Sequence, residues 1–596
     1  MHPEPFEDSR RLTGCNVYFP GTGAALETAA GLPFQGEALA RWRDRIDVAR
    51  KALGWPDDKV VVREHRSGAS LAFAAPSDQL YTATEVNEWA WWSAALHGAG
   101  AEGFLALHTP GHAAIWDADS ALRTLQAAAR AEANPALRAL QREAARRALP
   151  FLPDDDAVSI GAGDGSAVWA MDALPATTAV DWPALHAIPT VLVTGSNGKT
   201  TTVRLVAAMT RAHGWHTAHS CTDGVFFDGQ TLESGDFSGP TGARTALRQR
   251  DAQAAILETA RGGILRRGLA TCSADAAVVT NIAADHFGEY GVHDLDDLAM
   301  VKLTVARAIG DAGLLVLNAD DPVLQRRSRT LSCPIGWFAL DYDSDELQAH
   351  RQAGGATCGV REGALRLHYR GDEHDLGSIA AMPLTLQARA AYNIANIAAA
   401  ALAAAALGVA ADTIAGTLLR FGDARDDNPG RLQRWDFDAL QVVLDYAHNP
   451  DGLRGLLHAV GADQRAGRLA ILLGHAGNRE DADLRAVAAT AAGFRPELAV
   501  LKDSGGYERG RGSGEIATIM RAELLRSGIG EGAIAVRLDE VKAARCALEW
   551  ARDGDLLVLP IHELAARDRI VSLLDCLQQQ KWRPQKPLPE ACGDAP

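Results

Sequence analysis

Val191-Leu-Val-Thr-Gly195-Ser-Asn-Gly198-Lys199-Thr200-Thr201 is the stretch that decides the fold. An apolar run leads into a glycine turn and then into a segment with helical periodicity that continues through Met209. Glycines at such a turn let backbone N–H groups face an anion at a helix start, and a lysine neutralises phosphate charge. The longer form of this motif would have glycine at position 193, which is valine here. The shorter pattern G-x-x-G-K-T still predicts a strand, a phosphate-binding turn and a helix.

Two later segments place polar residues where further predicted strands end. Ile256-Leu-Glu258 precedes a glycine turn, and Thr280-Asn281 is soon followed by Asp285-His286. Ligands of open α/β sheets bind beyond the carboxyl ends of the strands, so these groups are expected near Thr200. Glu258 is then a candidate magnesium ligand and His286 a candidate metal or phosphate contact. Taken singly, each is as well explained as a solvated or structural residue.

The chain downstream of Pro189 alternates short β-branched runs with helical periodicity, which predicts βαβ units and a mainly parallel sheet. A second set of such runs begins near Arg431, and the Asp-Asp-Asn-Pro-Gly stretch at 426–430 separates the two sets. The predicted strands are 190–194, 254–257, 276–280, 314–317, 441–444, 469–473, 498–501 and 555–559. We therefore predict an α/β protein of three domains, 1–188, 189–428 and 429–596.

The first 188 residues differ from the rest in composition. They hold eight of the thirteen tryptophans, and a long Ala/Arg/Leu stretch from about 121 to 149 has helical character. We interpret most of these rings as core residues and predict a mixed α/β domain.

Composition excludes several classes of protein. The 596 residues are 47% hydrophobic and 22% charged, as in globular chains and unlike disordered or fibrous ones. A net charge of −16 argues against a nucleic-acid partner. The eight cysteines lack the spacing of a disulfide framework or zinc site, which favours a reducing cytoplasm. We expect no secretory signal and no membrane partner, because the longest apolar run, 397–411, fits a buried helix.

Six motifs in this order resemble the Mur ligase superfamily, most closely the Mur-like half of cyanophycin synthetases. The resemblance covers about 189–575. The motifs are Gly195-Ser-Asn-Gly-Lys-Thr-Thr, Glu258-Thr-Ala-Arg-Gly-Gly-Ile-Leu-Arg, Asn281-Ile-Ala-Ala-Asp-His, Leu317-Asn-Ala-Asp-Asp-Pro322, Pro429-Gly-Arg431 and Asp445-Tyr-Ala-His-Asn-Pro450.

This resemblance implies an ATP-dependent amide ligase with a central P-loop ATPase domain and a C-terminal Rossmann-like domain that closes over the nucleotide. It implies that the γ-phosphoryl group of ATP passes to an acceptor carboxylate and that an amino acid's amine attacks the acyl phosphate. ATP and Mg²⁺ are the implied cofactors. The implied catalytic residues are Lys199, Glu258, His286 and Lys302, of which Lys302 aligns with a lysine that many of these ligases carbamylate. By sequence pattern alone, Lys302 would be an ordinary surface lysine.

The same resemblance assigns the remaining nucleotide and metal contacts. Asn396 is expected near the adenine, Arg431 at the phosphates and Asp445 at the ribose. The implied phosphate-binding residues are Gly195, Asn197, Gly198, Lys199 and Thr200, and the implied metal ligands are Thr201, Glu258, His286 and Lys302.

Substrate contacts are implied on both sides of the nucleotide. Acceptor-side loops carry Thr222, Asp223, Asp236 and Arg261, and loops that receive the amino acid carry His448, Asn478, Arg479, Asp503 and Arg509. Cyanophycin synthetase has a more acidic run where this chain has Asp503-Ser-Gly-Gly-Tyr507. Fewer carboxylates are left to pair a guanidinium, which argues against arginine as the amine.

The N-terminal region is the largest departure from cyanophycin synthetase, which carries an ATP-grasp ligase ahead of its Mur-like half. Fewer than 190 residues precede the Mur-like part here, so we expect a single-step ligase whose N-terminal domain holds the acceptor. Two alternatives stay open. One is a different amine, either ammonia from a glutaminase partner or glutamate added to a pterin-like acceptor; the other is a non-catalytic binding protein. A homo-oligomer is also left open.

Overall fold

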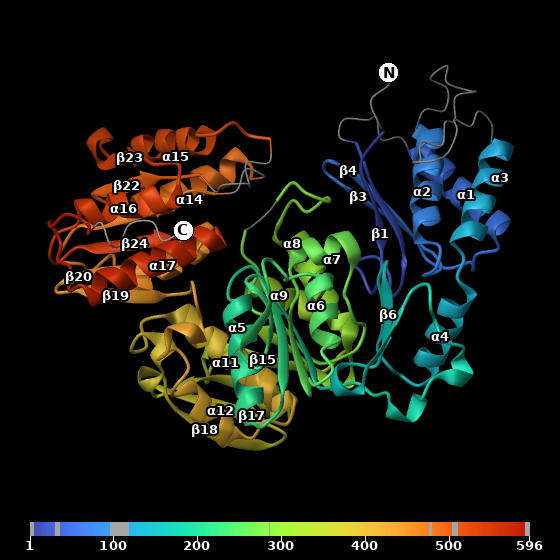
Figure 1. Ribbon diagram of the computed structural model, residues 1–596, viewed down its shortest axis with the longest axis horizontal. Helices are drawn as coiled ribbons and strands as arrows, with labels where there is room; N and C mark the ends of the chain where they lie inside the picture. The colour runs from blue at the N-terminus through green and yellow to red at the C-terminus, as the bar shows by residue number, and fades with distance from the viewer. Residues whose placement is uncertain are drawn as a thin grey trace.

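The computed structural model describes residues 5–29, 36–95, 118–284, 287–475, 479–503 and 510–589. We name its three parts the N-terminal unit (5–188), the central unit (189–428) and the C-terminal unit (429–589). Figure 1 shows the central unit at the bottom, the N-terminal unit at the upper right and the C-terminal unit at the upper left. The central unit therefore contacts both of the others.

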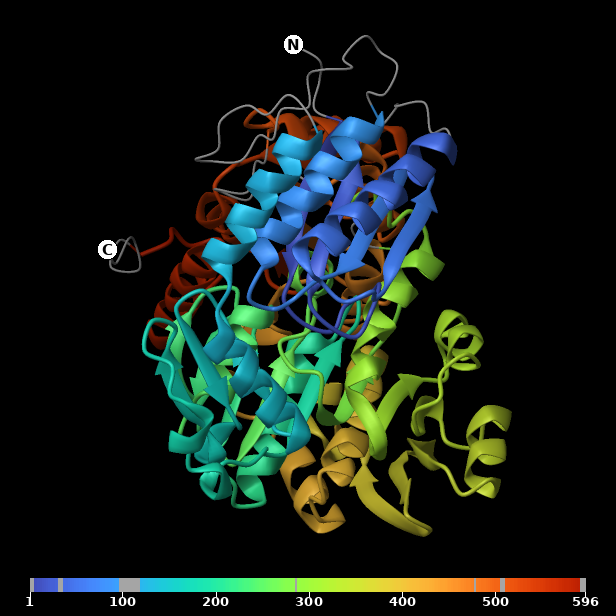
Figure 2. The ribbon, with the colours of Figure 1, turned by 90° about the vertical axis from the view of Figure 1, so that its right-hand side faces the viewer.

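The N-terminal unit is built on an antiparallel sheet with its helices on one face. The strand order is β1 (Phe6–Leu12), β2 (Gly23–Thr28), β4 (Gly68–Ala74), β3 (Val60–His65). Helices α1 (Gly36–Leu53), α2 (Leu80–Ala95) and α3 (Ala118–Glu132) lie side by side on the outer face (Figures 1 and 2). Four of the predicted core tryptophans, Trp42, Trp55, Trp89 and Trp91, are buried between these layers. Trp116 lies outside the described residues.

The helical stretch predicted at 121–149 is helical in the structure, where it is divided into two helices. Helix α3 ends at Glu132 and α4 (Pro135–Arg146) begins three residues later. Pro135 has no N–H to continue a helix, and the Asn134 side chain accepts a hydrogen bond from the Leu137 N–H as an N-cap. A small antiparallel sheet, β5 (Phe151–Pro153), β6 (Ala157–Ile160) and β7 (Ala167–Ala170), then leads to the central unit.

The central unit contains an eleven-stranded sheet whose middle is parallel, as the βαβ pattern predicts. Strands β9, β12, β8, β13, β14, β15 and β16 run parallel, and antiparallel pairs extend the sheet at both edges. The order is β11 (Gln230–Ser234), β10 (Gly224–Phe227), β9 (Thr217–Cys221), β12 (Ala254–Glu258), β8 (Thr190–Thr194), β13 (Ala274–Val279), β14 (Ile309–Asn318), β15 (Ile335–Asp341), β16 (Ala356–Arg361), β17 (Ala364–Tyr369), β18 (Asp372–Ser378).

Helices cover both faces of this sheet, which explains why its central strands are apolar throughout. Along β8, Val191 and Val193 pack toward α5 (Lys199–Ala212), α11 (Ala391–Ala406) and α12 (Ala411–Leu418). Leu192 points to the opposite layer. That layer contains α6 (Pro240–Leu247), α7 (Arg261–Arg267), α8 (Leu295–Lys302) and α9 (Pro322–Ser328). Helix α10 (Asp345–Gln352) flanks β15 and β16.

The C-terminal unit is a second α/β layer structure with a six-stranded sheet. The order is β19 (Gln433–Phe437), β20 (Leu440–Asp445), β24 (Leu556–Pro560), β21 (Leu469–Leu473), β22 (Leu498–Leu501), β23 (Ile534–Val536), with only β19 antiparallel among these described strands. One face is covered by α13 (Pro450–Ala459), α14 (Asp481–Gly493) and α15 (Glu515–Arg526), and the other by α16 (Glu540–Trp550) and α17 (Leu564–Gln579).

A disulfide joins two units of the fold. Cys15, in the loop after β1, is bonded to Cys272, just before β13. The cysteine spacing did not predict this bond, because the two residues are 257 positions apart. The loop after β1 is thus covalently attached to the central unit.

Candidate functional site

The predicted phosphate loop connects β8 to α5 and depends on two glycines. Gly195 has φ +145° and Gly198 φ +84°, a region that side-chain-bearing residues seldom occupy. A Cβ on Gly195 would lie 1.8 Å from Thr280 Oγ1, and one on Gly198 would lie 2.1 Å from Asn396 Oδ1. Neither position has room for a side chain.

The two residues directly after the neighbouring strand β13 hold this loop in place. The Asn197 N–H donates to Asn281 Oδ1 at 3.0 Å. Its carbonyl accepts from Thr280 Oγ1 at 2.5 Å and from Asn281 Nδ2 at 3.1 Å. These bonds fix the loop shape before any anion binds, so its N–H groups need little reorganisation.

Two lysines donate to backbone carbonyls of the same loop. Lys199 Nζ donates to the Ser196 oxygen at 3.2 Å, and Lys302 Nζ donates to the Gly195 oxygen at 2.8 Å. Lys302 is buried, with 4% of its surface exposed, so it is not the surface lysine that its local sequence suggests. Helix α8 thus delivers its last residue to the loop.

Glu258, the last residue of β12, is buried beside the loop. Its two carboxylate oxygens accept from Thr200 Oγ1 and Thr222 Oγ1, each at 2.9 Å. Thr201 has a different environment, because its hydroxyl accepts from Asn428 Nδ2 at 3.2 Å. Of the two threonines in the motif, Thr200 is therefore the one that contacts Glu258.

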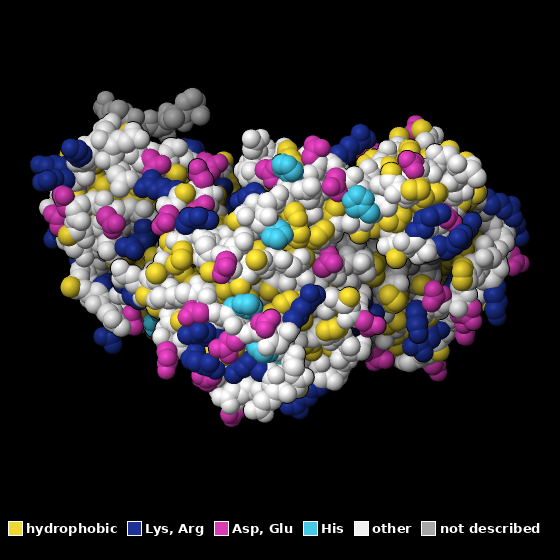
Figure 3. Space-filling view, turned by 90° about the horizontal axis from the view of Figure 1, so that it is seen from below, with side chains coloured by type: hydrophobic (Ala, Val, Ile, Leu, Met, Phe, Trp, Pro, Cys, Tyr) yellow, Lys and Arg dark blue, Asp and Glu magenta, His cyan; other side chains and the backbone are white. Residues whose placement is uncertain are grey.

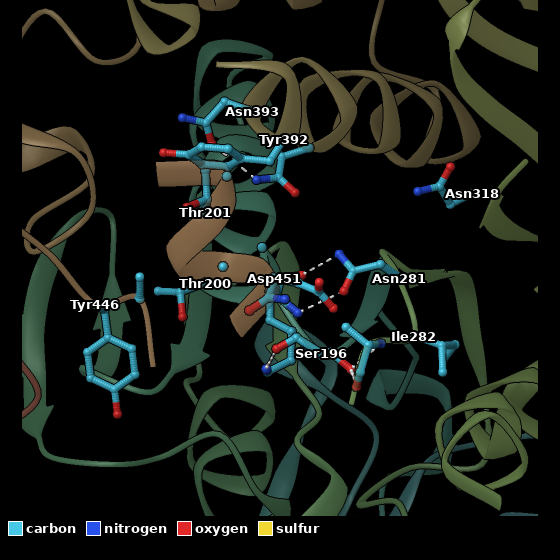
Figure 4. Close-up of a pocket in the computed structure, with 18 of the residues that line it drawn as sticks. Ser196, Thr200, Thr201, Asn281, Ile282, Asn318, Tyr392, Asn393, Tyr446 and Asp451 are labelled. Carbon is cyan, nitrogen blue, oxygen red and sulfur yellow. Dashed lines mark hydrogen bonds between the residues drawn. The ribbon is translucent and has the colours of Figure 1, made fainter. Parts of the chain in front are cut away.

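A cavity of about 480 Å³ opens over the loop, between the central and C-terminal units (Figure 4). Figure 4 shows Tyr392 and Asn393 on one side of the cavity, Asn281 and Asn318 on another, and Tyr446 across from them. Cavities of this size are typical of small-ligand sites. The predicted residues that line it are Asn197, Gly198, Lys199, Thr200, Thr201, Thr222, Glu258, Asn396, Arg431, Asp445 and His448.

The C-terminal wall of the cavity is organised around Asp445. Its oxygens accept from the Leu432 N–H at 2.7 Å and the Ala447 N–H at 2.8 Å. Burial raises the pKa of Asp445, while the nearby Arg431 opposes that shift. The Arg431 guanidinium lies 4.2 Å from the centre of the Tyr446 ring, a cation–π distance. Arg431 is thus held at the cavity by an aromatic face.

Tyr392, Asn393 and Asn396 form the side of the cavity where the adenine is expected. Asn396 Nδ2 donates to Asn393 Oδ1 at 3.1 Å. Burial raises the pKa of the Tyr392 hydroxyl well above its usual value, so this hydroxyl stays protonated. Tyr392 and Asn393 are cavity residues that the sequence reasoning did not single out, although they adjoin Asn396.

Asp223, predicted on the acceptor side, lies in an ion-pair cluster that joins two units. It accepts from Arg204 Nη2 of α5 and from Arg567 Nη1 of α17, each at 2.6 Å. Burial alone would raise its pKa, but Arg431, Arg204 and Arg567 hold the pKa below its usual value. Neither Arg204 nor Arg567 carries a sequence signal for this contact.

The remaining predicted substrate residues are scattered. Asp236 is exposed and accepts from Ser238, while Arg261 is buried and donates to Glu289 Oε2 at 3.0 Å. Arg479 and Asp503 are buried in the C-terminal unit, where Asp503 Oδ2 accepts from the Gly514 N–H at 2.8 Å. The other three predicted site residues, His286, Asn478 and Arg509, lie outside the described residues.

A buried polar chain lies behind the C-terminal wall. Lys502, fully buried at the end of β22, is paired with Glu540. Lys502 Nζ also donates to His562 Nδ1 at 3.4 Å, and His562 Nε2 donates to the Ala447 oxygen at 3.2 Å. Burial and the Lys502 charge hold the pKa of His562 well below its usual value, so the ring is neutral. The chain fixes the loop after Asp445 from behind.

The donor set fits a magnesium nucleotide. In the described part of the chain, no three His, Cys, Asp or Glu side chains gather into a metal-binding group. Mg²⁺ does not require one, because it usually takes one or two carboxylates and completes its shell with waters and substrate phosphates. Glu258 and the Thr200 hydroxyl beside the phosphate loop supply oxygen donors of that kind.

Family comparison agrees with this geometry. Residues 193–404 match the model of the Mur ligase middle domain, and residues 430–560 match the Mur ligase, glutamate ligase domain. The chain belongs to the Mur ligase family. Its two Mur ligase domains contain the central sheet around the loop and the C-terminal wall of the cavity.

Individual relatives of this Mur ligase family member are longer or more distant. It is 33% identical over 374 residues to a cyanophycin synthetase of Synechocystis, a match that covers 62% of this chain and 42% of that one. It is 29% identical over 398 residues to a UDP-N-acetylmuramoyl-L-alanyl-D-glutamate--2,6-diaminopimelate ligase of Geobacter metallireducens, covering 62% and 73%. A solved structure of E. coli FolC with DHPP and ADP aligns with TM-score 0.47 and 17% identity, covering 65% and 89%. The chain thus matches less than half the length of the cyanophycin synthetase.

Among the described helices, none has both the length and the apolar character needed to cross a membrane. Figure 3 shows basic and acidic side chains side by side over much of the face seen there.

Proposed function

We propose that this chain is an ATP-dependent ligase that joins the amine of an amino acid to the carboxylate of an acceptor. The observation that carries the proposal is one cavity lined by the phosphate loop and Glu258 from the central unit and by Arg431 from the C-terminal unit. The two Mur ligase domain matches and the curated ligase names of the relatives support it.

The reaction we propose has two steps. An acceptor carboxylate oxygen attacks the γ-phosphorus of ATP, the bond to ADP breaks, and an acyl phosphate forms. The amine nitrogen then attacks the acyl carbon, phosphate leaves, and the amine gives its proton to solvent. Phosphoryl transfer of this kind relies on positioning and charge neutralisation and needs no protein nucleophile.

The residues divide these tasks between two units. In our proposal Lys199 and the N–H groups of the loop neutralise the phosphates from one side, and Arg431 does so from the other. Glu258 and Thr200 would hold Mg²⁺, which supplies charge stabilisation at the transferred phosphoryl group when bound. Asn396 would face the adenine and Asp445 the ribose, and Thr201 and His286 stay proposed metal contacts.

We also propose that Lys302 is carbamylated. Its Nζ is buried beside the loop and donates to the Gly195 oxygen, and the family resemblance aligns it with a lysine that many of these ligases carbamylate. A carbamate would add oxygen donors for a second Mg²⁺. Density showing a bare ammonium at Lys302 in crystals grown with bicarbonate would contradict this proposal.

Phosphate release from ATP and Mg²⁺ tests the proposed function. All amino acids are assayed with free aspartate, β-aspartyl peptides and glutamyl compounds as acceptors, because an aspartate-like carboxylate is our proposed acceptor. We expect release that requires one acceptor and one amine and that disappears in Lys199→Ala. ADP binding without release for any pair, ammonia included, would favour a non-catalytic binding protein instead.

A further inference from the structure

The inner face of the N-terminal sheet, opposite α1–α3, carries a buried polar cluster. Strand alternation sends Ala24, Leu26 and Leu71 toward the helices. Side chains at the alternate positions of the same strands point to the inner face, away from the helices. The cluster consists of Arg10, Glu27, Arg63, His65, Ser67 and Ser70, and we refer to it as the inner-face cluster.

Glu27 is the centre of this cluster. Its carboxylate accepts from Arg10 Nη2 at 2.7 Å and from Ser70 Oγ at 2.8 Å, and His65 Nε2 lies 3.4 Å away. Burial would raise the pKa of Glu27, but His65, Arg10 and Ser70 hold it below the usual value. A buried ionic group of this kind is well ordered when its partners are satisfied.

From this cluster, Arg10 reaches the end of α7. Arg10 Nε donates to the Leu265 oxygen at 2.8 Å. Nearby, the Thr13 N–H donates to the Arg267 oxygen at 2.8 Å. Helix α7 begins three residues after Glu258, so β1 holds the element that directly follows this carboxylate.

Strand β3 reaches α8 and the loop before it. Arg63 Nη2 donates to the Tyr290 oxygen at 2.5 Å, and Nη1 lies 3.4 Å from Asp297 Oδ1. Ser67 Oγ and His293 Nε2 are 2.9 Å apart. Asp297 lies in the first turn of α8, and the last residue of α8 is Lys302, which donates to the Gly195 oxygen.

We propose that the inner-face cluster is a positioning element for the catalytic centre. It fixes the positions of α7 and α8 relative to one another. It thereby fixes the positions of Glu258 and Lys302 beside the phosphate loop. The residues that line this cavity begin at Ser196 within the described chain, so the N-terminal unit can influence the cavity only through these helices. This inference rests on the proposed function.

If the cluster positions these helices, its loss should slow phosphoryl transfer without weakening nucleotide binding. The phosphate loop is held by Thr280 and Asn281 of the central unit, so ADP affinity should survive loss of the cluster. A displacement of Glu258 or Lys302 by a fraction of an ångström should slow phosphoryl transfer, since small misplacements can cost about 10²-fold in rate.

The test compares Arg63→Met, Asp297→Asn and their double mutant with the control Arg43→Met. Arg43 is an exposed arginine of α1 in the same unit. We expect kcat to fall about 10-fold or more in both single mutants, with ADP affinity and KM for ATP unchanged and with non-additive effects in the double mutant. Arg43→Met should match the wild type.

Hydrogen–deuterium exchange of residues 295–302 is measured in parallel and needs no substrate. Faster exchange there in Arg63→Met, with exchange in the C-terminal sheet unchanged, would support the positioning role. Unchanged exchange at 295–302 in Arg63→Met would overturn it. So would a fall in ADP affinity and in the thermal midpoint that accompanies the fall in kcat. A wild type that binds ADP but releases no phosphate would overturn the proposed function instead, while the exchange result would still decide the positioning.

Discussion

Asp223 Oδ1 accepts a hydrogen bond from Arg567 Nη1 at 2.6 Å, joining the loop after β9 to α17 across 344 residues of sequence. Asp223 also accepts from Arg204, so one buried carboxylate neutralises two guanidinium groups from different units. This carboxylate is therefore one of the contacts that hold the central and C-terminal units together, beside others such as Asn449 Nδ2 to Asn197 Oδ1 at 2.9 Å.

Replacing that charge should weaken the contact between the central and C-terminal units and lower the free energy of unfolding. Asp223→Asn removes the carboxylate that the buried Arg204 pairs with and leaves Arg567 with only Asp568, and breaking such a buried pair costs about 3–5 kcal/mol of unfolding free energy. Urea denaturation at neutral pH measures this loss. The control Asp438→Asn removes a largely exposed pair with Arg583, for which about 1 kcal/mol or less is expected. Equal losses of unfolding free energy in both variants would contradict the role of Asp223 in holding the two units together.

The pH dependence of the same difference has a defined sign. Because Asp223 has a lowered folded-state pKa, its stabilisation is complete above the unfolded pKa of about 3.9 and is lost as pH falls through the folded value. The gap between wild type and Asp223→Asn should shrink in urea titrations below about pH 4. A gap that grows on acidification would count against this ion pair.

Gly195→Ala should abolish nucleotide binding. The new Cβ would lie 1.8 Å from Thr280 Oγ1 at a positive φ, so the loop must move away from β13. We expect ADP affinity, measured by calorimetry, to fall by about 10²-fold or more as the oriented N–H groups are lost. Gly310→Ala is the matched control, because a Cβ there meets nothing within 4 Å. ADP binding equal to the control would show that the loop tolerates a side chain.

Lys502→Met should destabilise the C-terminal unit. It leaves the Glu540 carboxylate buried without its cation, at a cost of about 3–5 kcal/mol. Adding Glu540→Gln removes the stranded charge while keeping an acceptor for the His562 N–H, so the double mutant should be more stable than Lys502→Met. Urea unfolding of the two variants checks this order. The reverse order would mean that the pair is not the source of the loss.

His562→Gln should reduce the acid sensitivity of the fold. Burial, then Lys502, His475 and His448, hold the pKa of His562 below its unfolded value, so unfolding takes up a proton in mildly acidic solution. Its contribution is complete above about pH 6.5 and is lost as pH falls below that value. We expect a smaller stability loss between about pH 7 and 5 than in the wild type. Burial lowers the pKa of His219 to about 3, so part of the dependence of stability on pH remains in the variant.

The local sequence pattern was enough to predict the main strands of the central and C-terminal units. Strands 469–473 and 498–501 were predicted with the boundaries that the structure has, because fully buried parallel strands are short continuous apolar runs. Glu258 was correctly expected at a strand end. Its partners Thr200 and Thr222 come together only through the pairing of β12 with β8 and β9.

Contacts between distant segments could not be predicted in this way. Arg567 and Lys502 lie in segments that read as ordinary helix and strand ends, and only packing of the units shows what they touch. The strands of the N-terminal sheet were also not predicted, since charged residues such as Arg10, Glu27 and Arg63 stand on its inner face, where the sequence alone suggests exposure to solvent. In the structure that face is covered by α7 and the loop before α8.

The chain passes from the central to the C-terminal unit through residues that are themselves part of the nucleotide cavity wall. Asn428 donates to Thr201, and Arg431, three residues later, lines the cavity. A change in the angle between the two sheets would therefore displace Arg431 in the cavity wall. The linker between the two units and Arg431 belong to one stretch of backbone, so a nucleotide bound at Arg431, as we propose, would restrict the angle between the units.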